Sequence, residues 1–188
     1  MTKDRGVNGF WGTRLQQVML FLCRHPEQEF YDLEISKRSG VTRSATNYAL
    51  RDLAQRGWIE RERRGRMSFY RARLDHPLVR KLKVLDALLA LEPVWKQLFP
   101  LSERVVLFGS VAEGRNVPGS DLDLLVVTNQ AEKVKRAALK FPEGIQVLIK
   151  TPVEWAGMAK SHSVFAREVE RGLALWQTSF DHEKKFGN

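Results

Sequence analysis

A glycine–serine pair in the C-terminal half is the first feature of this sequence that is suited to chemistry. Gly109-Ser110 directly follows the apolar run 105–108, which predicts a buried strand, and it precedes a segment with helical character. A turn at a helix start presents free backbone N–H groups to an anion, and glycine lets a phosphate approach the main chain closely. Gly-Ser pairs are common in ordinary turns, so the prediction of a phosphate site depends on the residues downstream of the pair.

Two aspartates stand downstream, after ten intervening residues. Asp121 and Asp123 lie at the start of an apolar run that predicts a second buried strand. Alternate side chains of a strand share a face, so both carboxylates project together, about 6.5–7 Å apart along the chain. Two such carboxylates repel each other unless a cation lies between them, and hard oxygen ligands suit Mg²⁺ shared with nucleotide phosphates. Ser120 directly precedes the pair and is a further candidate for orienting this loop.

The spacing of these residues resembles that of the DNA polymerase β-like nucleotidyltransferase superfamily, and it is most similar to the minimal nucleotidyltransferases. The resemblance covers about residues 100–177. It implies that Gly109 and Ser110, with Ser120 beside them, bind the triphosphate of an NTP. It further implies that Asp121 and Asp123 are the catalytic and metal-binding carboxylates, with Mg²⁺ as the cofactor.

One position departs from the pattern of that superfamily. Its third carboxylate stands on the next strand, here residues 144–150, where the residue that faces the aspartate pair is Gln146. An amide neither binds a cation strongly nor accepts a proton at neutral pH. We therefore expect a nucleotide site whose transfer chemistry is impaired, since loss of a general base costs about 10²–10⁴ in rate. A shifted strand register would weaken this argument.

The N-terminal half predicts a helix-turn-helix. Apolar residues at helical spacing predict a first helix that ends at His25-Pro26, namely Leu15, Val18, Met19 and Leu22. Asp32 is the expected N-cap of a short second helix over 33–39, and Gly40 suits the left-handed position after it. Thr42 is the expected cap of a third helix over 43–55.

The third helix has two faces. Ala45, Ala49 and Leu53 repeat every four residues and are expected to pack inward, flanked by Tyr48 and Leu50. The opposite face presents a polar set that suits the major groove of DNA, where Arg reads guanine and Asn reads adenine. This set is Arg43, Ser44, Asn47 and Arg51.

A β-hairpin is predicted directly after this helix. Strands over 58–63 and 67–71 flank a tight turn at 64–66, and the candidate DNA-contacting arginines of the hairpin are Arg63, Arg64 and Arg66. A hairpin in this place is a wing, whose arginines contact phosphates or the minor groove. Residues 13–75 resemble winged helix-turn-helix transcriptional regulators, and the string at 57–61 that opens the wing is typical of them.

The distribution of charge agrees with a polyanionic partner. The chain has a net charge of +9, and residues 37–73 alone hold 11 basic and 3 acidic residues. A basic surface concentrated in one segment favours nucleic acid as the partner, although a charge run is also the ordinary composition of a solvated face.

These features predict an α+β protein of two domains. Residues 1–92 are expected to form a winged helix-turn-helix with a linker helix, and residues 93–188 a nucleotidyltransferase-like mixed β-sheet with flanking helices. The linker helix is expected to begin at His76-Pro77 and to be interrupted at Glu92-Pro93. Its predicted apolar stripe is Leu78, Leu82, Leu85 and Leu89. The single cysteine, Cys23, is expected to pack in a core and not to react.

The leading hypothesis for function is a cytoplasmic transcriptional regulator that binds double-stranded DNA as a homodimer and binds a nucleotide in its C-terminal domain. The alternative is an active Mg²⁺-dependent nucleotidyltransferase of the antitoxin type, which modifies a protein or small molecule with NMP. An interaction scaffold that binds a protein partner is the third reading. No stretch approaches the roughly 20 apolar residues of a membrane span, so no membrane association is expected.

Overall fold

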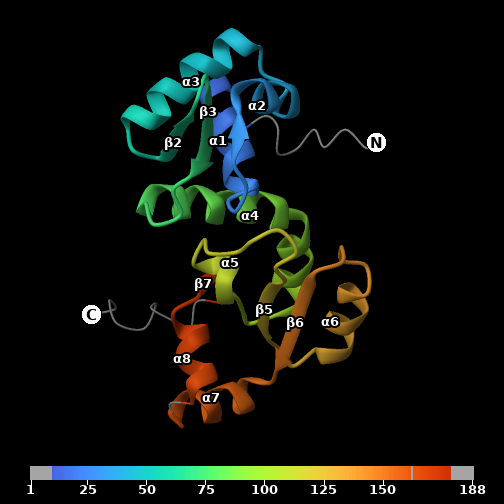
Figure 1. Cartoon of the computed structure of the whole chain (residues 1–188). Helices are drawn as coiled ribbons and strands as arrows, with labels where there is room; N and C mark the ends of the chain where they lie inside the picture. Colours follow the sequence, from blue (N-terminus) through green and yellow to red (C-terminus); the bar gives the residue numbers. More distant parts are fainter. Residues whose placement is uncertain (1–9, 162, 179–188) are drawn as a thin grey trace, which may run out of the picture. The chain divides into compact units, whose positions relative to one another are not determined.

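The computed structural model describes residues 10–161 and 163–178 of the chain. These residues form two compact units, each with its own core. Of the described residues, the first unit contains those up to Ala90 together with the loop Glu113–Ser120, and the second contains Leu91–Ala112 and those from Asp121 onward (Figure 1). Among the described residues, no helix combines the length and the apolar character that crossing a membrane requires.

The first unit is a winged helix, as the sequence predicts. Its strands form an antiparallel sheet in the order β1-β3-β2, and β2 and β3 form the wing. Gly40 ends the second helix with a φ of 72°, which confirms the left-handed turn between the helices. The elements in chain order are α1 (Arg14–Arg24), β1 (Phe30–Tyr31), α2 (Asp32–Ser39), α3 (Arg43–Gln55), β2 (Ile59–Arg64) and β3 (Met67–Ala72).

Two sequence-based expectations for this unit are wrong. Helix α2 begins at Asp32 with Tyr31 as its N-cap, so Asp32 lies inside the helix, and its carboxylate accepts a hydrogen bond from Arg43 Nε at 2.9 Å. Tyr48 does not flank the core but is 73% exposed. The fully buried Thr46 takes the inward position that we expected Tyr48 to share.

Helix α4 (Pro77–Leu98) also differs from expectation, because it continues through Pro93. An internal proline removes one helical hydrogen bond and costs about 3 kcal/mol. Burial of Leu91, Val94 and Leu98 around it offsets this cost. Leu78 is 51% exposed and does not belong to the buried stripe; in its place Val79 is buried in the core of the first unit.

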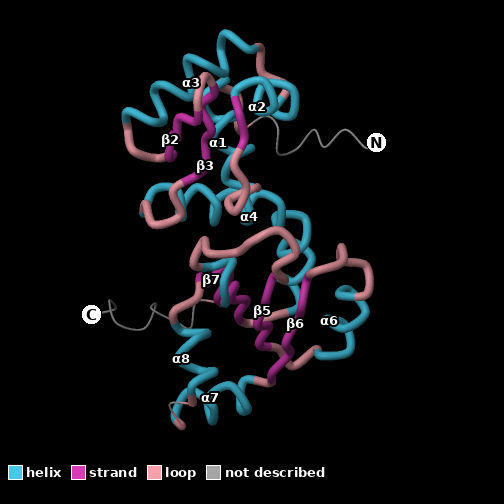
Figure 2. The backbone as a smooth tube through the Cα atoms, viewed as in Figure 1, coloured by secondary structure: helices cyan, strands magenta, loops and turns pink. Residues whose placement is uncertain are grey.

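The second unit is built on a mixed four-stranded sheet in the order β6-β5-β4-β7. Figure 2 shows β5 beside β6 in this sheet. Strands β5 and β6 are parallel, and the other pairs are antiparallel. The predicted α+β class is therefore confirmed. After the 3₁₀ turn η1 (Phe99–Leu101), the elements are β4 (Arg104–Phe108), α5 (Gly109–Ala112), β5 (Leu122–Val127), α6 (Ala131–Ala138), β6 (Ile145–Lys150), α7 (Pro152–Lys160), α8 (Val164–Glu170) and β7 (Leu173–Gln177).

Cys23 lies in the core of the first unit and is 2% exposed. Burial raises the pKa of its thiol to about 12. Because the thiolate is the nucleophile, we expect the folded protein not to react with a thiol-specific reagent at pH 8, and the protein in guanidinium chloride to react with one equivalent. Rapid labelling of the native protein would show that Cys23 is not packed as described.

Candidate nucleotide site and nucleic-acid interface

The turn at Gly109 places the candidate phosphate-binding residues beside the carboxylates. Strand β4 ends at Phe108, which pairs with Asp123 of the antiparallel strand β5. Gly109 is the next residue and has a φ of 73°, and a Cβ atom there would lie 2.7 Å from Asp123 Oδ2. The positive φ favours glycine here, and any side chain would displace the Asp123 carboxylate or the turn, so the sequence motif corresponds to a close approach between the two.

The two carboxylates have different surroundings. Asp121 is exposed just before β5 begins, and Asp123 is partly buried within it. Burial raises the pKa of the Asp123 carboxyl, and the negative charges of Asp121 and Glu168 raise it further. The repulsion expected between the aspartates is therefore present, and Glu168 of α8 adds a carboxylate that sequence reasoning missed.

Gln146 lies where the sequence predicts it. The register of the parallel strands pairs Asp123 with Gln146, and Gln146 Nε2 donates a hydrogen bond to Asp121 Oδ2 at 2.7 Å. A neutral amide donor thus faces the aspartate pair from β6. A carboxylate at the same position would repel the two aspartates.

The donor set fits a divalent cation only in part. Two carboxylates supply hard oxygen ligands, and phosphate oxygens and water complete such a site for Mg²⁺. Across residues 10–161 and 163–178, no cluster of three or more His, Cys, Asp or Glu side chains is arranged to hold a metal ion.

The two candidate serines lie at opposite ends of the loop. Ser110 is the second residue of α5 and is partly exposed. The Ser120 hydroxyl accepts a hydrogen bond from Val117 N–H at 2.9 Å, so it closes the turn ahead of Asp121. This contact agrees with the role of orienting the loop.

Helix α3 presents the candidate DNA-contacting face. Arg43, Ser44 and Arg51 are exposed, and Asn47 is half-buried. Burial acts to raise the pKa of Asp32, but hydrogen bonds from Arg43 and Asn47 outweigh it and hold that pKa below its ordinary value. Asp32 therefore orients two of the candidate residues from the neighbouring helix.

Tyr48 belongs to the same exposed face and was missed as a candidate. It lies four residues after Ser44 and three before Arg51, which is the spacing of one helix face. This spacing was the available signal, but the aromatic ring suggested burial. An exposed tyrosine at this position offers an apolar surface and a hydroxyl to a nucleic acid.

The wing arginines are not equivalent. The Arg64 guanidinium is paired with Glu62 at 2.6 Å and with Glu29 at 2.9 Å, and Arg63 Nε donates to Gly65 O at 3.2 Å. Arg66, in the turn, lines a hollow of about 310 Å³ together with Arg43. Arg66 and the exposed face of α3 are thus better placed to meet a phosphate than Arg64.

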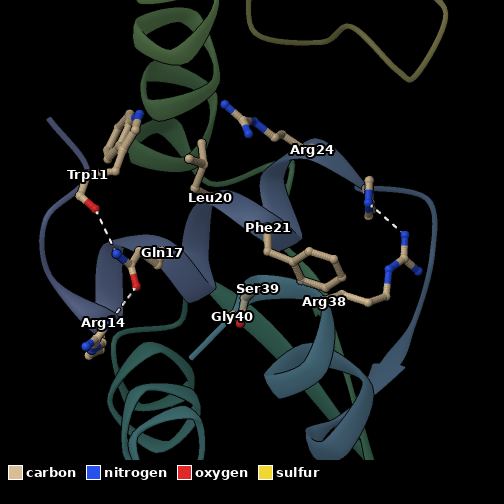
Figure 3. A pocket seen from close by; sticks show the side chains of 10 residues that line it. Trp11, Arg14, Gln17, Leu20, Phe21, Arg24, Arg38, Ser39 and Gly40 are labelled. Atoms are coloured by element: carbon tan, nitrogen blue, oxygen red, sulfur yellow. Dashed lines mark hydrogen bonds between the residues drawn. The ribbon is translucent and has the colours of Figure 1, made fainter. Parts of the chain in front are cut away.

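A second, larger hollow of about 750 Å³ lies on the first unit, and three arginines line it (Figure 3). Arg24 forms a two-point ion pair with Asp86, and Arg38 contacts His25 Nε2 at 2.9 Å. The Arg38 guanidinium also lies over the rings of Phe21 and Phe30. These contacts join the helices of the unit, so the hollow is not assigned to an anion.

Comparison with known families identifies both units. The MarR family model matches residues 14–65, and the nucleotidyltransferase domain model matches residues 89–175. No curated protein sequence matches the chain.

Solved structures share parts of the fold at low similarity. The antimony-specific transcriptional repressor AntR is 20% identical, with a TM-score of 0.36 over 48% of this chain and 78% of its own. A protein described as a candidate nucleotidyltransferase from Sulfolobus solfataricus is 20% identical, with a TM-score of 0.32 over 52% and 83%. The archaeal chromatin protein TrmBL2 is 16% identical, with a TM-score of 0.33 over 87% and 76%.

The MarR match lies within the first unit, and the nucleotidyltransferase match covers most of the second unit together with the loop 113–120. The chain is a MarR-type DNA-binding regulator fused to a nucleotidyltransferase domain.

Proposed function

We propose that this regulator binds a Mg²⁺–NTP complex in its nucleotidyltransferase domain as a ligand and transfers the nucleotide poorly or not at all. The observation that carries this proposal is the hydrogen bond from Gln146 to Asp121, because an amide replaces the third carboxylate of the superfamily. The residues for nucleotide and metal are retained, whereas a group that accepts a proton from an attacking hydroxyl is absent from β6.

In this proposal each part of the turn has one task. The backbone at Gly109 and the Ser110 hydroxyl bind phosphate oxygens, and Asp121 and Asp123 hold the metal, with Ser120 fixing the loop that leads to them. Mg²⁺ would neutralise the charge of the phosphates. Gln146 then donates to a carboxylate or phosphate oxygen and leaves no anionic ligand for a second cation.

The DNA-binding part of the proposal names the residues that meet the operator. Base edges are read from α3 by Arg43, Asn47 and Arg51, with Ser44 beside them, and phosphates are bound by Arg66 with Arg63 and Arg64 on the wing. We further propose that the protein acts in the cytoplasm as a homodimer on two half-sites and that the functional domains are residues 1–92 and 93–188. Half-sites one helical turn apart, about 34 Å, would suit two recognition helices.

Glu168 supports a second candidate function, an active nucleotidyltransferase that modifies a protein or small molecule. Its charge contributes to the raised pKa of Asp123, so a carboxylate on α8 lies within electrostatic range of the pair, although the three side chains are not arranged to hold a metal ion. In this reading Glu168 takes the part of the acid missing from β6. The two candidates differ in whether nucleotide is consumed.

Calorimetry with Mg²⁺ and ATP, followed by the other three ribonucleoside triphosphates, tests nucleotide binding. We expect Asp121→Asn to weaken the affinity at least tenfold, because a charged metal ligand is lost. Glu132→Gln, which removes an exposed charge from α6, is the matched control and should change the affinity less than twofold. No binding by the native protein would reject the proposal and favour a scaffold that binds a protein partner.

A labelling assay separates the two candidate functions: the protein is incubated with labelled NTP, Mg²⁺ and cell extract, and covalently labelled products are sought. The proposal predicts no covalently labelled product under conditions in which an active relative labels its target. A labelled product that requires both Asp123 and Glu168 would establish the enzyme in its place.

A further inference from the structure

An acidic side chain lies against the candidate base-reading residues of α3. Asp32 is the first residue of α2 and Arg43 is the first residue of α3, and the two side chains are bonded to each other. In helix-turn-helix proteins the N-terminal residues of the recognition helix approach the base edges. A carboxylate in this place opposes DNA, because it repels the phosphates. Its contacts with Arg43 and Asn47 show what it contributes.

The bond between Arg43 and Asp32 leaves most of the guanidinium unoccupied. Arg43 Nε donates to Asp32 Oδ2 at 2.9 Å. A guanidinium has five N–H donors, so this bond uses one of them and leaves the four on the two Nη atoms. Among the described residues, the Arg43 side chain makes no other hydrogen bond or ion pair, and it is 63% exposed. The carboxylate thus holds the guanidinium at Nε while both Nη groups stay accessible.

Asn47 lies four residues after Arg43 and contacts the same carboxylate. Burial acts to raise the pKa of Asp32, but hydrogen bonds from Arg43 and Asn47 outweigh it, so the carboxylate is ionised at neutral pH. An ionised carboxylate only accepts hydrogen bonds. It therefore takes an N–H of the Asn47 amide and leaves the carbonyl oxygen of that amide for another partner. One acceptor on α2 restrains both side chains.

A restrained Arg43 distinguishes bases better than a free one. Guanine presents two acceptors, O6 and N7, in the major groove, whereas adenine presents a donor in place of the first. A free arginine loses rotamer freedom on binding, and it can turn to a phosphate that carries no sequence information. A side chain that is held in place before binding avoids this loss and keeps its direction.

We infer that Asp32 is a positioning residue that sets the base preference of α3, by holding Arg43 at Nε so that its two Nη groups meet a guanine. This inference rests on the proposed reading of bases by α3. Asp32 raises specificity in two ways. It orients Arg43 and Asn47 toward base edges, and its negative charge weakens binding to DNA on which these side chains find no match.

Asp32→Ala tests the inference, and Asp52→Ala is the matched control. Asp52 accepts a hydrogen bond from Arg56 Nε at 2.9 Å, with 28% of the Asp52 side chain exposed against 24% for Asp32. The control removes the same charge and the same kind of bond, but from an arginine that follows the last residue of α3 and lies outside the proposed DNA contacts.

Fluorescence anisotropy measures the affinity for the protein's own upstream DNA, for a series in which each base pair of the bound site is replaced, and for an unrelated duplex. Native protein and Asp52→Ala are expected to lose about 5- to 150-fold when the guanine read by Arg43 is replaced. Arg43→Ala identifies that base pair, because this variant should lose less than twofold there. In Asp32→Ala the loss should be at least threefold smaller than the native one, while affinity for unrelated DNA stays the same or rises up to tenfold.

Asp32→Asn keeps the size of the side chain and a neutral acceptor, so its discrimination should lie between those of the native protein and Asp32→Ala. Circular dichroism shows whether each variant is folded, and Asp32→Asn decides the matter if Asp32→Ala is not. Native discrimination at this base pair in the folded Asp32 variants would overturn the inference and leave the proposed base reading intact.

Two further results would also overturn the positioning role. If Asp32→Ala changes the preference at the same base pair in an Arg43→Ala background, Asp32 contacts a base directly. If Arg43→Ala changes the preference at no base pair, the proposed reading by Arg43 is wrong, and the inference fails with it.

Discussion

Replacing Arg43 and Arg51 together by alanine is expected to weaken binding to a specific DNA site by about 10²–10⁴-fold. Both side chains are exposed on the face of α3 that also carries Asn47. A good contact between a side chain and a base is worth about 1–3 kcal/mol, and two such losses in separate turns of a helix are roughly additive. The loss should be much smaller on unrelated DNA, where only charge is removed.

Fluorescence anisotropy at several salt concentrations measures this effect, with Arg136→Ala and Lys140→Ala as the control. The control removes the same charge from exposed positions of the second unit. If both double variants weaken binding equally, general electrostatic attraction explains the affinity, and the recognition role of α3 is wrong. If the Arg43/Arg51 variant still prefers the specific site but its affinity depends less steeply on salt concentration, the two arginines contact phosphates and not bases.

Replacing Gly109 by alanine is expected to weaken Mg²⁺–NTP binding by about 10²-fold. The added Cβ atom would overlap Asp123 Oδ2 at 2.7 Å, so the carboxylate or the phosphate-binding turn must shift. Such a shift removes one or two hydrogen bonds to charged phosphate oxygens, each worth about 1.5–3 kcal/mol, and about 2.7 kcal/mol corresponds to 10²-fold in affinity. Calorimetry measures the loss, and circular dichroism shows whether the fold is retained.

Gly119→Ala is the matched control for this change. Gly119 also has a positive φ, 87°, but a Cβ atom there would meet nothing within 4 Å. The variant carries the backbone strain of alanine in this conformation, about 1–2 kcal/mol, without the overlap. We expect nucleotide affinity within about threefold of the native value. If Gly109→Ala and Gly119→Ala lose the same amount of nucleotide affinity, backbone strain explains the loss, and the overlap with the Asp123 carboxylate does not.

The sequence was sufficient where a residue type and its spacing determine a local structure. Gly40 predicts the left-handed turn, which is observed, and the run at Asp121 predicts a strand, which is observed from Leu122 and therefore contains Asp123 but not Asp121. The register that brings Gln146 beside Asp123 could also be predicted from strand alternation, because β5 and β6 are adjacent and parallel. The turn and the strand depend on few contacts outside their own segments, and the register adds only the pairing of two neighbouring strands.

Features that depend on tertiary contacts were missed. Pro93 does not interrupt α4, because burial on both sides of it offsets the lost hydrogen bond. Tyr48 is exposed because smaller residues fill the inward side of α3. The charge of Glu168, which raises the pKa of Asp123, comes from a helix 45 residues further along the chain. The contact of Lys83 with Asn116 joins segments 33 residues apart, and neither residue type predicts it.

A crystal structure of the protein with Mg²⁺ and the preferred NTP tests the central claim most directly. We predict one Mg²⁺ bound by Asp121 and Asp123, phosphates on the turn at Gly109 and Ser110, and the Gln146 amide in contact with an oxygen of the site, without a second metal. A second metal ion held with the help of Glu168 would contradict the account and establish a catalytic centre.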